Sequence, residues 1–348
     1  MKKNGLIASM LFAAAAMLLA AGVSFAGDAP KLSGVAYVAG HGGHLAVLNL
    51  ASGSLDRIVI TGAGGELEGK IAGLTLDPAH AGPGGGTHGA AQVGRNLYVG
   101  LLNGKVMKYN LDTQKLDDMG QVGKKFCGAV NGPGGDIYYE DMADGNVYVF
   151  DPKSDKAADS FNVGMAVCGI GWTKDGKKAF VSDMVQGKVF VLDWKTKKKE
   201  KEIVVGTFIH QARTNPAQTE LWVTAPNEFK VEAKGPVPNS VDPNRKDRSK
   251  SELVIIDMAK EKVKSTIDLS DQGAFAHDLA FTPDGKYALV TARTYGDDSI
   301  MLTIDTKSHK VLAETSLCKA CHENAGVKVS IDNNSPLLCG ITVDWNAK

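Results

Sequence analysis

Residues 167–205, VCGIGWTKDGKKAFVSDMVQGKVFVLDWKTKKKEKEIVV, contain four short strand-like stretches separated by turns. The first stretch is Val167-Cys168-Gly169-Ile170, and glycine marks two of the turns, Lys174-Asp175-Gly176 and Gln186-Gly187. The stretches are rich in Val, Ile and Phe, which favour strands. Four strands in about forty residues are typical of one blade of a β-propeller.

The opening phrase of this unit recurs along the chain, each time followed by further strand-like stretches. The four other occurrences are Ile71-Ala72-Gly73-Leu74, Phe126-Cys127-Gly128, Ile209-His210 and Ala276-His277-Asp278-Leu279. Five blades are therefore written in sequence order.

A sixth blade is divided between the two ends of the chain. Residues 338–343 have the opening phrase with nothing after it, whereas residues 35–38 and 45–48 supply later strands without a first one. Joining them closes the ring and pairs edges that would otherwise stay open. With 40 Gly, few aromatic residues and no long helical periodicity, the sequence predicts an all-β fold. We expect a single propeller domain at residues 27–348, with six blades, or seven if the long insertions hide another.

The repeats resemble the YVTN-type repeat propellers, a group similar to the haem d1 domain of periplasmic nitrite reductases. Phe281-Thr282-Pro283-Asp284-Gly285-Lys286, followed by Tyr287-Ala288-Leu289-Val290, carries the resemblance best. It implies a propeller over nearly the whole mature chain. It implies no particular activity, because propellers host many chemistries.

Cys318-Lys319-Ala320-Cys321-His322 has the spacing of a c-type haem attachment site. In such a site Cys318 and Cys321 bond to the haem vinyl groups and His322 ligates the iron. A zinc half-site, a redox dithiol and a disulfide are the alternatives, but no second ligand pair or βαβ setting lies nearby. The sequence predicts one covalent haem c, with its attachment loop at residues 317–338.

The N-terminus has the form of a secretory signal peptide. Lys2 and Lys3 precede an apolar run at residues 6–23, and Ser24-Phe25-Ala26 offers a cleavage site. We expect cleavage after Ala26 and a bacterial periplasmic location, with a retained membrane anchor as the alternative. Loss of two Lys from 39 basic and 39 acidic residues leaves a near-neutral chain, which gives no argument for nucleic acid or a membrane as partner.

Aligned by their opening phrases, the blades place one residue each at one mouth of the central channel: Ala72, Cys127, Cys168, His210, His277 and Cys339. Sulfur and imidazole groups converging there suggest a second metal site for copper, zinc or iron. Packing and hydrogen bonding alone are the alternative. A disulfide between Cys127 and Cys168 is a further possibility, although first strands of adjacent blades splay apart and can exceed the ~7 Å limit between Cα atoms.

The turns between second and third strands should open on the same face as this ring. They carry the candidates for a second axial ligand of the haem iron, which are His41, His44, Met184 and Met142. The Gly-rich stretch Gly84-Gly85-Gly86-Thr87-His88 is interpreted as a flexible insertion on the opposite face.

Three functions follow from these features. The first is a periplasmic c-type haem protein that transfers electrons to a redox partner protein or serves as a subunit of a redox enzyme. The second is a metal-dependent oxidoreductase that uses the Cys/His ring. The third is a non-enzymatic scaffold that binds a partner protein. The sequence leaves open whether the protein is an enzyme.

Overall fold

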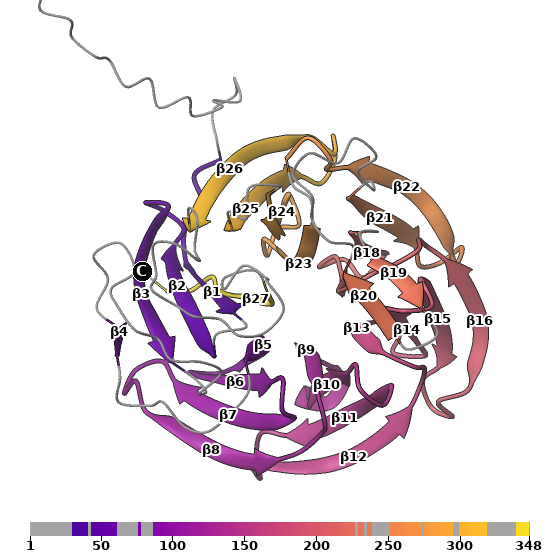
Figure 1. Cartoon of the computed structure of the whole chain (residues 1–348), viewed down its shortest axis with the longest axis horizontal. Coiled ribbons are helices and arrows are strands. Elements are labelled where there is room, and N and C mark those ends of the chain that lie inside the picture. Colours follow the sequence, from indigo (N-terminus) through magenta and orange to yellow (C-terminus); the bar gives the residue numbers. More distant parts are fainter. Residues whose placement is uncertain are drawn as a thin grey trace, which may run out of the picture.

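In the computed structural model, six sheets, each built on four antiparallel strands, stand around a central axis as the blades of a propeller (Figure 1). The structure describes residues 30–40, 43–60, 76–77, 86–226, 229–232, 235–238, 251–272, 275–294, 299–318 and 339–347. Within these ranges the only helical element is a single 3-10 turn, η2 (Pro133–Gly135). The all-β fold and the six blades are therefore confirmed.

Five blades follow one another along the chain, and the four strands of each blade succeed one another from the channel outward. Blade 2 is β5 (Thr87–Val93), β6 (Asn96–Leu101), β7 (Lys105–Asn110) and β8 (Leu116–Gln121). Blade 3 is β9 (Phe126–Asn131), β10 (Ile137–Asp141), β11 (Asn146–Asp151) and β12 (Lys156–Asn162). Blade 4 is β13 (Val167–Trp172), β14 (Lys178–Asp183), β15 (Lys188–Asp193) and β16 (Lys199–Val204). Blade 5 is β17 (Ala212–Thr214), β18 (Glu220–Ala225), β21 (Glu252–Asp257) and β22 (Lys262–Asp268), with the hairpin β19 (Phe229–Glu232) and β20 (Gly235–Pro238) inserted after β18. Blade 6 is β23 (Phe275–Phe281), β24 (Tyr287–Arg293), β25 (Ser299–Asp305) and β26 (Val311–Cys318).

Blade 1 closes the ring with strands from both ends of the chain. Its order is β27 (Ile341–Asp344), β1 (Val35–Gly40), β2 (His44–Asn49) and β3 (Ser54–Ile60), with the short β4 (Leu76–Asp77) paired to β3. The C-terminal strand β27 pairs antiparallel with β1, from Val35 opposite Asp344 to Val38 opposite Ile341. The predicted closure is thus confirmed, with β27 as the innermost strand.

Burial follows the position of a strand within its blade. Every residue of β13 is buried, because an inner strand is covered on both sides by neighbouring blades, whereas the outermost β16 is mostly exposed. The Thr-x-Asp-Gly turns connect first and second strands in two blades. Thr173 donates a hydrogen bond to Asp175, and Thr282 donates to Asp284, each over 2.7 Å. Gly176 and Gly285 then take positive φ angles of 65° and 69°, which few other residues adopt readily.

One strand was assigned wrongly from the sequence. We expected residues 71–74 to begin blade 2, but its first strand is β5, which pairs with β6 through the two-residue turn Gly94-Arg95. So short a connection costs little closure entropy, whereas residues 71–74 would need a loop of more than twenty residues. Residues 71–74, with Ala72, lie outside the described ranges.

In the described part of the chain we find no helix with the length and apolar character needed to cross a membrane. The expected signal peptide, residues 1–26, lies outside that part and stays a prediction.

Candidate functional site: the channel mouth

Each blade contributes one residue to a ring at one mouth of the channel. We call it the mouth ring; it consists of His88, Cys127, Cys168, His210, His277 and Cys339. All six are buried, with exposed fractions of 4% or less. The structure thus brings together the side chains of four of the five candidates from the sequence, whereas the side chain of Cys339 packs in the apolar core with Tyr37 and Leu45. The structure replaces Ala72 by His88, which lies in the stretch we had interpreted as an insertion on the opposite face.

Three imidazoles face one another within the mouth ring. The ring centroid of His210 lies 3.9 Å from that of His277, and His88 lies 4.9 Å from His277 and 5.6 Å from His210. One ring nitrogen from each of the three lies within 4.8 Å of the others. The Nδ1 atom of His88 also makes a hydrogen bond to the backbone carbonyl of Cys127. This arrangement suits a metal that prefers nitrogen ligands.

Two of the ring cysteines are joined to each other. Cys127 and Cys168 form a disulfide between blades 3 and 4, with their Cα atoms 5.1 Å apart. This is the disulfide that the sequence left open as a possibility, and the Cα separation is within the ~7 Å limit. Their sulfurs lie 3.5 to 3.8 Å from ring nitrogens of His210, so Cys127, Cys168 and His210 would form a second group of metal ligands only if the disulfide were reduced. Among cysteines whose side chains are described, Cys339 is the one outside this disulfide.

Hydrogen bonds from neighbouring blades hold the backbone of the mouth ring. Ser182 donates to the carbonyl of His210 over 2.9 Å, Thr224 to that of His277 over 2.8 Å, and Thr291 to that of Cys339 over 3.0 Å. These hydroxyls come from the second strands of three successive blades. The amide of Gly340 donates to the carbonyl of His88 over 2.7 Å. The ring backbone is thus fixed independently of any bound group.

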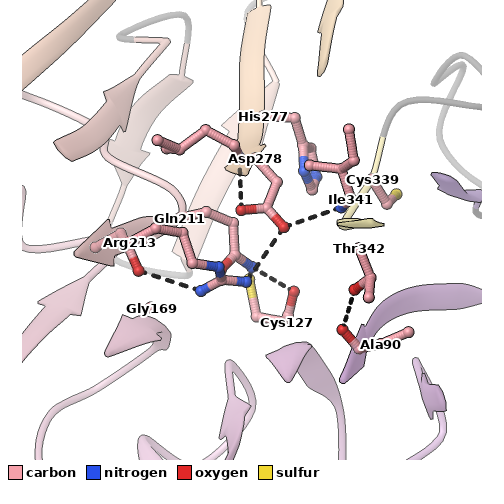
Figure 2. Close-up of polar contacts among 12 residues, drawn as sticks. Ala90, Cys127, Gly169, Gln211, Arg213, His277, Asp278, Cys339, Ile341 and Thr342 are labelled. Atoms are coloured by element: carbon pink, nitrogen blue, oxygen red, sulfur yellow. Dashed lines mark hydrogen bonds and ion pairs between the residues drawn. The ribbon is translucent and has the colours of Figure 1, made fainter. Parts of the chain in front are cut away.

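A layer of charged and polar side chains fills the channel beneath the mouth ring (Figure 2). Arg213 lies 3.2 Å from Asp278 and 3.6 Å from Glu140, and Gln211 donates to the carbonyl of Cys127 over 2.6 Å. Glycines at the matching position of other blades leave room for these side chains. At Gly128, for example, a Cβ atom would lie 2.4 Å from Oε2 of Glu140.

Burial dominates the electrostatics of this layer. It raises the pKa of Glu140 to about 7, although the nearby Arg213 acts in the opposite direction. Burial likewise raises the pKa of Asp278 against the effect of Arg213. Two carboxyl groups therefore share one guanidinium, and the charged form of each is disfavoured.

A cavity of about 840 Å³ lies at the other end of the channel, lined by the far ends of first strands from five blades. Arg213 forms part of its wall together with Ala90, Phe281, Thr342 and Trp345. The charged layer thus lies between this cavity and the mouth ring.

Strand register places the end of β26 on the mouth side. Phe275 pairs with Arg293, Arg293 with Ser299, and Ser299 with Cys318, so these residues form one row across blade 6 at the ring. The chain continues from Cys318 and is next described at Cys339, inside the mouth ring. Cys321 and His322 lie outside the described residues.

Of the candidate second axial ligands, two methionines are described with their side chains. Met184 is buried against Cys127, Cys168, Phe208 and Phe275, and Met142 packs at the edge of the same cluster. Both therefore lie on the mouth side, as expected. His44 begins β2 opposite Gly40, at the same end of blade 1, but its side chain is outside the description, as is the whole of His41.

No family model matches the sequence, and no curated protein matches it. Among solved structures, the chain is similar to the hydrazine synthase of Kuenenia stuttgartiensis, with 19% identity and a TM-score of 0.51. The likeness covers 69% of this chain and 67% of that one. At this level of identity it shows a shared propeller fold alone.

Proposed function

We propose that the protein is an exported c-type haem protein of the bacterial periplasm, which transfers electrons to a redox partner protein or within a redox enzyme. The observation that carries the proposal is the position of Cys318. This first cysteine of the Cys-x-x-Cys-His motif ends β26 in the row that contains Phe275 and Ser299, and the chain returns to the mouth ring at Cys339. A haem attached there would be covalently tied to the ring side of the propeller.

The residues present fit such a group. Cys318 and Cys321 would hold the haem and His322 would ligate its iron, while the haem itself would supply one-electron chemistry. The buried apolar cluster of Met184, Phe208 and Phe275 lies on the same side of the propeller. Met184, Met142, His44 and His41 are proposed as the group from which a second axial ligand comes.

The test is haem retention by the exported protein. After denaturation and acid-acetone extraction, we expect the haem absorbance to stay with the polypeptide, because thioether bonds survive this treatment. The double variant Cys318→Ala, Cys321→Ala should lose it, while Cys339→Ser, which alters a cysteine outside the motif, should keep it. Haem that leaves the parent protein in the organic phase would contradict the proposal. The mass of the mature chain would show whether cleavage follows Ala26.

The convergence of imidazoles favours a second candidate, an oxidoreductase in which a metal ion at the mouth ring exchanges electrons with the haem. A redox titration separates both from a non-enzymatic scaffold that binds a partner protein. A haem that neither takes up nor releases an electron over an accessible range of potential would favour the scaffold.

A further inference from the structure

The three imidazoles of the mouth ring come from distant parts of the sequence. His88 lies on β5, His210 directly before β17, and His277 on β23, so three blades must be assembled before these rings meet. We infer that His88, His210 and His277 together bind one late first-row transition-metal ion, copper or zinc, and that Cys127 and Cys168 are not among its ligands.

The distances need only small side-chain rotations. Metal–nitrogen bonds of about 2.0–2.1 Å place the nitrogens of a tetrahedral site about 3.4 Å apart. The three ring nitrogens already lie within 4.8 Å of one another, on a backbone held by Thr224, Ser182 and Gly340. Side-chain rotation about χ1 and χ2 can close the difference without moving a strand.

His88 has the hydrogen bond that a metal ligand needs. Its Nδ1 contacts the carbonyl oxygen of Cys127, which can only accept, so Nδ1 carries the proton and donates. The lone pair of His88 therefore lies on Nε2. Metal-ligating histidines commonly donate their other ring N–H to a carbonyl in this way, which fixes both the tautomer and the orientation of the ring.

The disulfide explains why the cysteines stand outside the ligand set. The thiolate is the form of cysteine that binds metals, and neither sulfur of the Cys127–Cys168 bond can become one while the bond is intact. The bond instead packs against the ring of His210, with sulfur to nitrogen distances of 3.5 Å or more.

The donor set indicates the class of metal. Neutral imidazole nitrogen suits copper, zinc, iron and nickel, and the affinity of divalent ions for such sites is highest for copper. Three protein ligands leave a position for water or a small molecule, as in catalytic rather than structural zinc sites.

The inference deepens the second candidate function, and its test reads metal content separately from haem. The haem-loaded full mature protein is incubated with Zn²⁺ alone or Cu²⁺ alone, passed through a desalting column, and analysed for copper, zinc and iron. We expect about one Zn or Cu per chain beyond the haem iron. The electron paramagnetic resonance spectrum of the copper form should show hyperfine coupling to imidazole nitrogen. Its absorption spectrum should contain no thiolate-to-copper charge-transfer band.

Substitutions test the ligand set. His88→Gln, His210→Gln and His277→Gln should each weaken metal binding at least about 100-fold, while haem content stays that of the parent. The matched control is His309→Asn, which removes an imidazole at the far end of blade 6. Asn is chosen because His309 has a φ angle of 61°, which Asn tolerates. The double variant Cys127→Ala, Cys168→Ala should still bind the metal.

Two results would overturn the inference. One is a parent protein that retains neither Zn nor Cu after loading; this measurement needs no variant and is unaffected by any folding defect. The other is a metal that the His88→Gln protein binds as tightly as the parent, or that is lost with the cysteine pair, because the ligands would then be Cys127, Cys168 and His210. If haem is absent but the metal binds, the proposed function fails and this inference stands.

Discussion

Glu140 places an ionisable carboxyl group in the interior of the propeller. Its carboxylate is fully buried, and this burial is the main cause of its raised pKa. Arg213, 3.6 Å away, also contacts Asp278 and cannot neutralise both.

Glu140 should make stability depend on pH. Because its folded pKa of about 7 lies above the ordinary 4.5, the unfolded chain loses its proton first, and the contribution of Glu140 to stability falls as pH rises from about 4.5 to 7. We expect the free energy of unfolding of Glu140→Gln, measured in urea and relative to that of the parent, to rise by about 3 kcal/mol at most between pH 5 and pH 8. The exposed Asp271→Asn serves as control. An equal difference at both pH values would contradict the raised pKa.

Gly128 tests whether the channel layer is tightly packed. An added Cβ would meet Oε2 of Glu140 at 2.4 Å and Nε2 of Gln211 at 2.7 Å. Gly128→Ala should therefore cost about 1–3 kcal/mol of unfolding free energy through overpacking. Combining it with Glu140→Gln should restore no stability, because the amide fills the same volume, whereas combining it with Glu140→Ala should restore only part, because the contact with Gln211 remains. A Gly128→Ala protein as stable as the parent would show that the layer can rearrange.

The sequence predicted most of the mouth ring because glycine directly follows several of its members. Cys127-Gly128, Cys168-Gly169 and Cys339-Gly340 share that pattern. His88-Gly89 has it too, and this signal would have identified His88, but a Gly-rich neighbourhood concealed it. The pairing of Cys127 with Cys168 and the convergence of His210 on His277 depend on how far adjacent blades tilt, which no local pattern encodes.

At the level of elements, the disulfide ties β9 to β13 and so joins blades 3 and 4 at the axis. Its sequence separation of 41 residues predicts a stabilisation of about 4 kcal/mol from the lost entropy of the unfolded chain, and measured values commonly fall between about 2 and 4. We expect the double variant Cys127→Ala, Cys168→Ala to have a free energy of unfolding about 2–4 kcal/mol below that of the parent. Peptide mapping without reductant should recover the linked fragments from the parent. Two free thiols at these positions, in protein exported to an oxidising compartment, would contradict the pairing.

The strand pattern was most informative where turns are short. All four strands of blade 4 were identified from the sequence, and the first strands of blades 3 and 6 were placed correctly, because glycine turns separate the short strands. Blade 5 was recognised across its long interruption, but the β19–β20 hairpin inside it was not, since Pro236 and Pro238 argue against a strand. The β19–β20 hairpin pairs over only four residues of each strand and forms a sheet of two edge strands, where proline is tolerated.

For the whole molecule, closure depends on one short strand. β27 pairs with β1, and it also contacts both neighbouring blades. Ile341 donates to Asp278 of blade 6 over 3.1 Å, and Asp344, with only 2% of its side chain exposed, lies 2.6 Å from Arg95 of blade 2. The sequence could predict this arrangement because a first strand at the C-terminus and a blade lacking one at the N-terminus are complementary.

Deleting the residues after Leu338 should therefore destabilise the entire ring. The loss removes the innermost strand of blade 1, exposes the edge of β1 and leaves Asp278 without one of its donors. We expect the unfolding temperature to fall by about 10 °C or more, since each kcal/mol corresponds to about 2–4 °C in a chain of this order of size. Truncation after Trp345, which keeps β27, should leave it nearly unchanged. If the shorter protein does not fold, hydrogen exchange on the intact protein gives the answer, because β27 amides should exchange as slowly as those of β1. Rapid exchange confined to β27, or equal unfolding temperatures for the two truncations, would mean that the ring holds without its C-terminal strand.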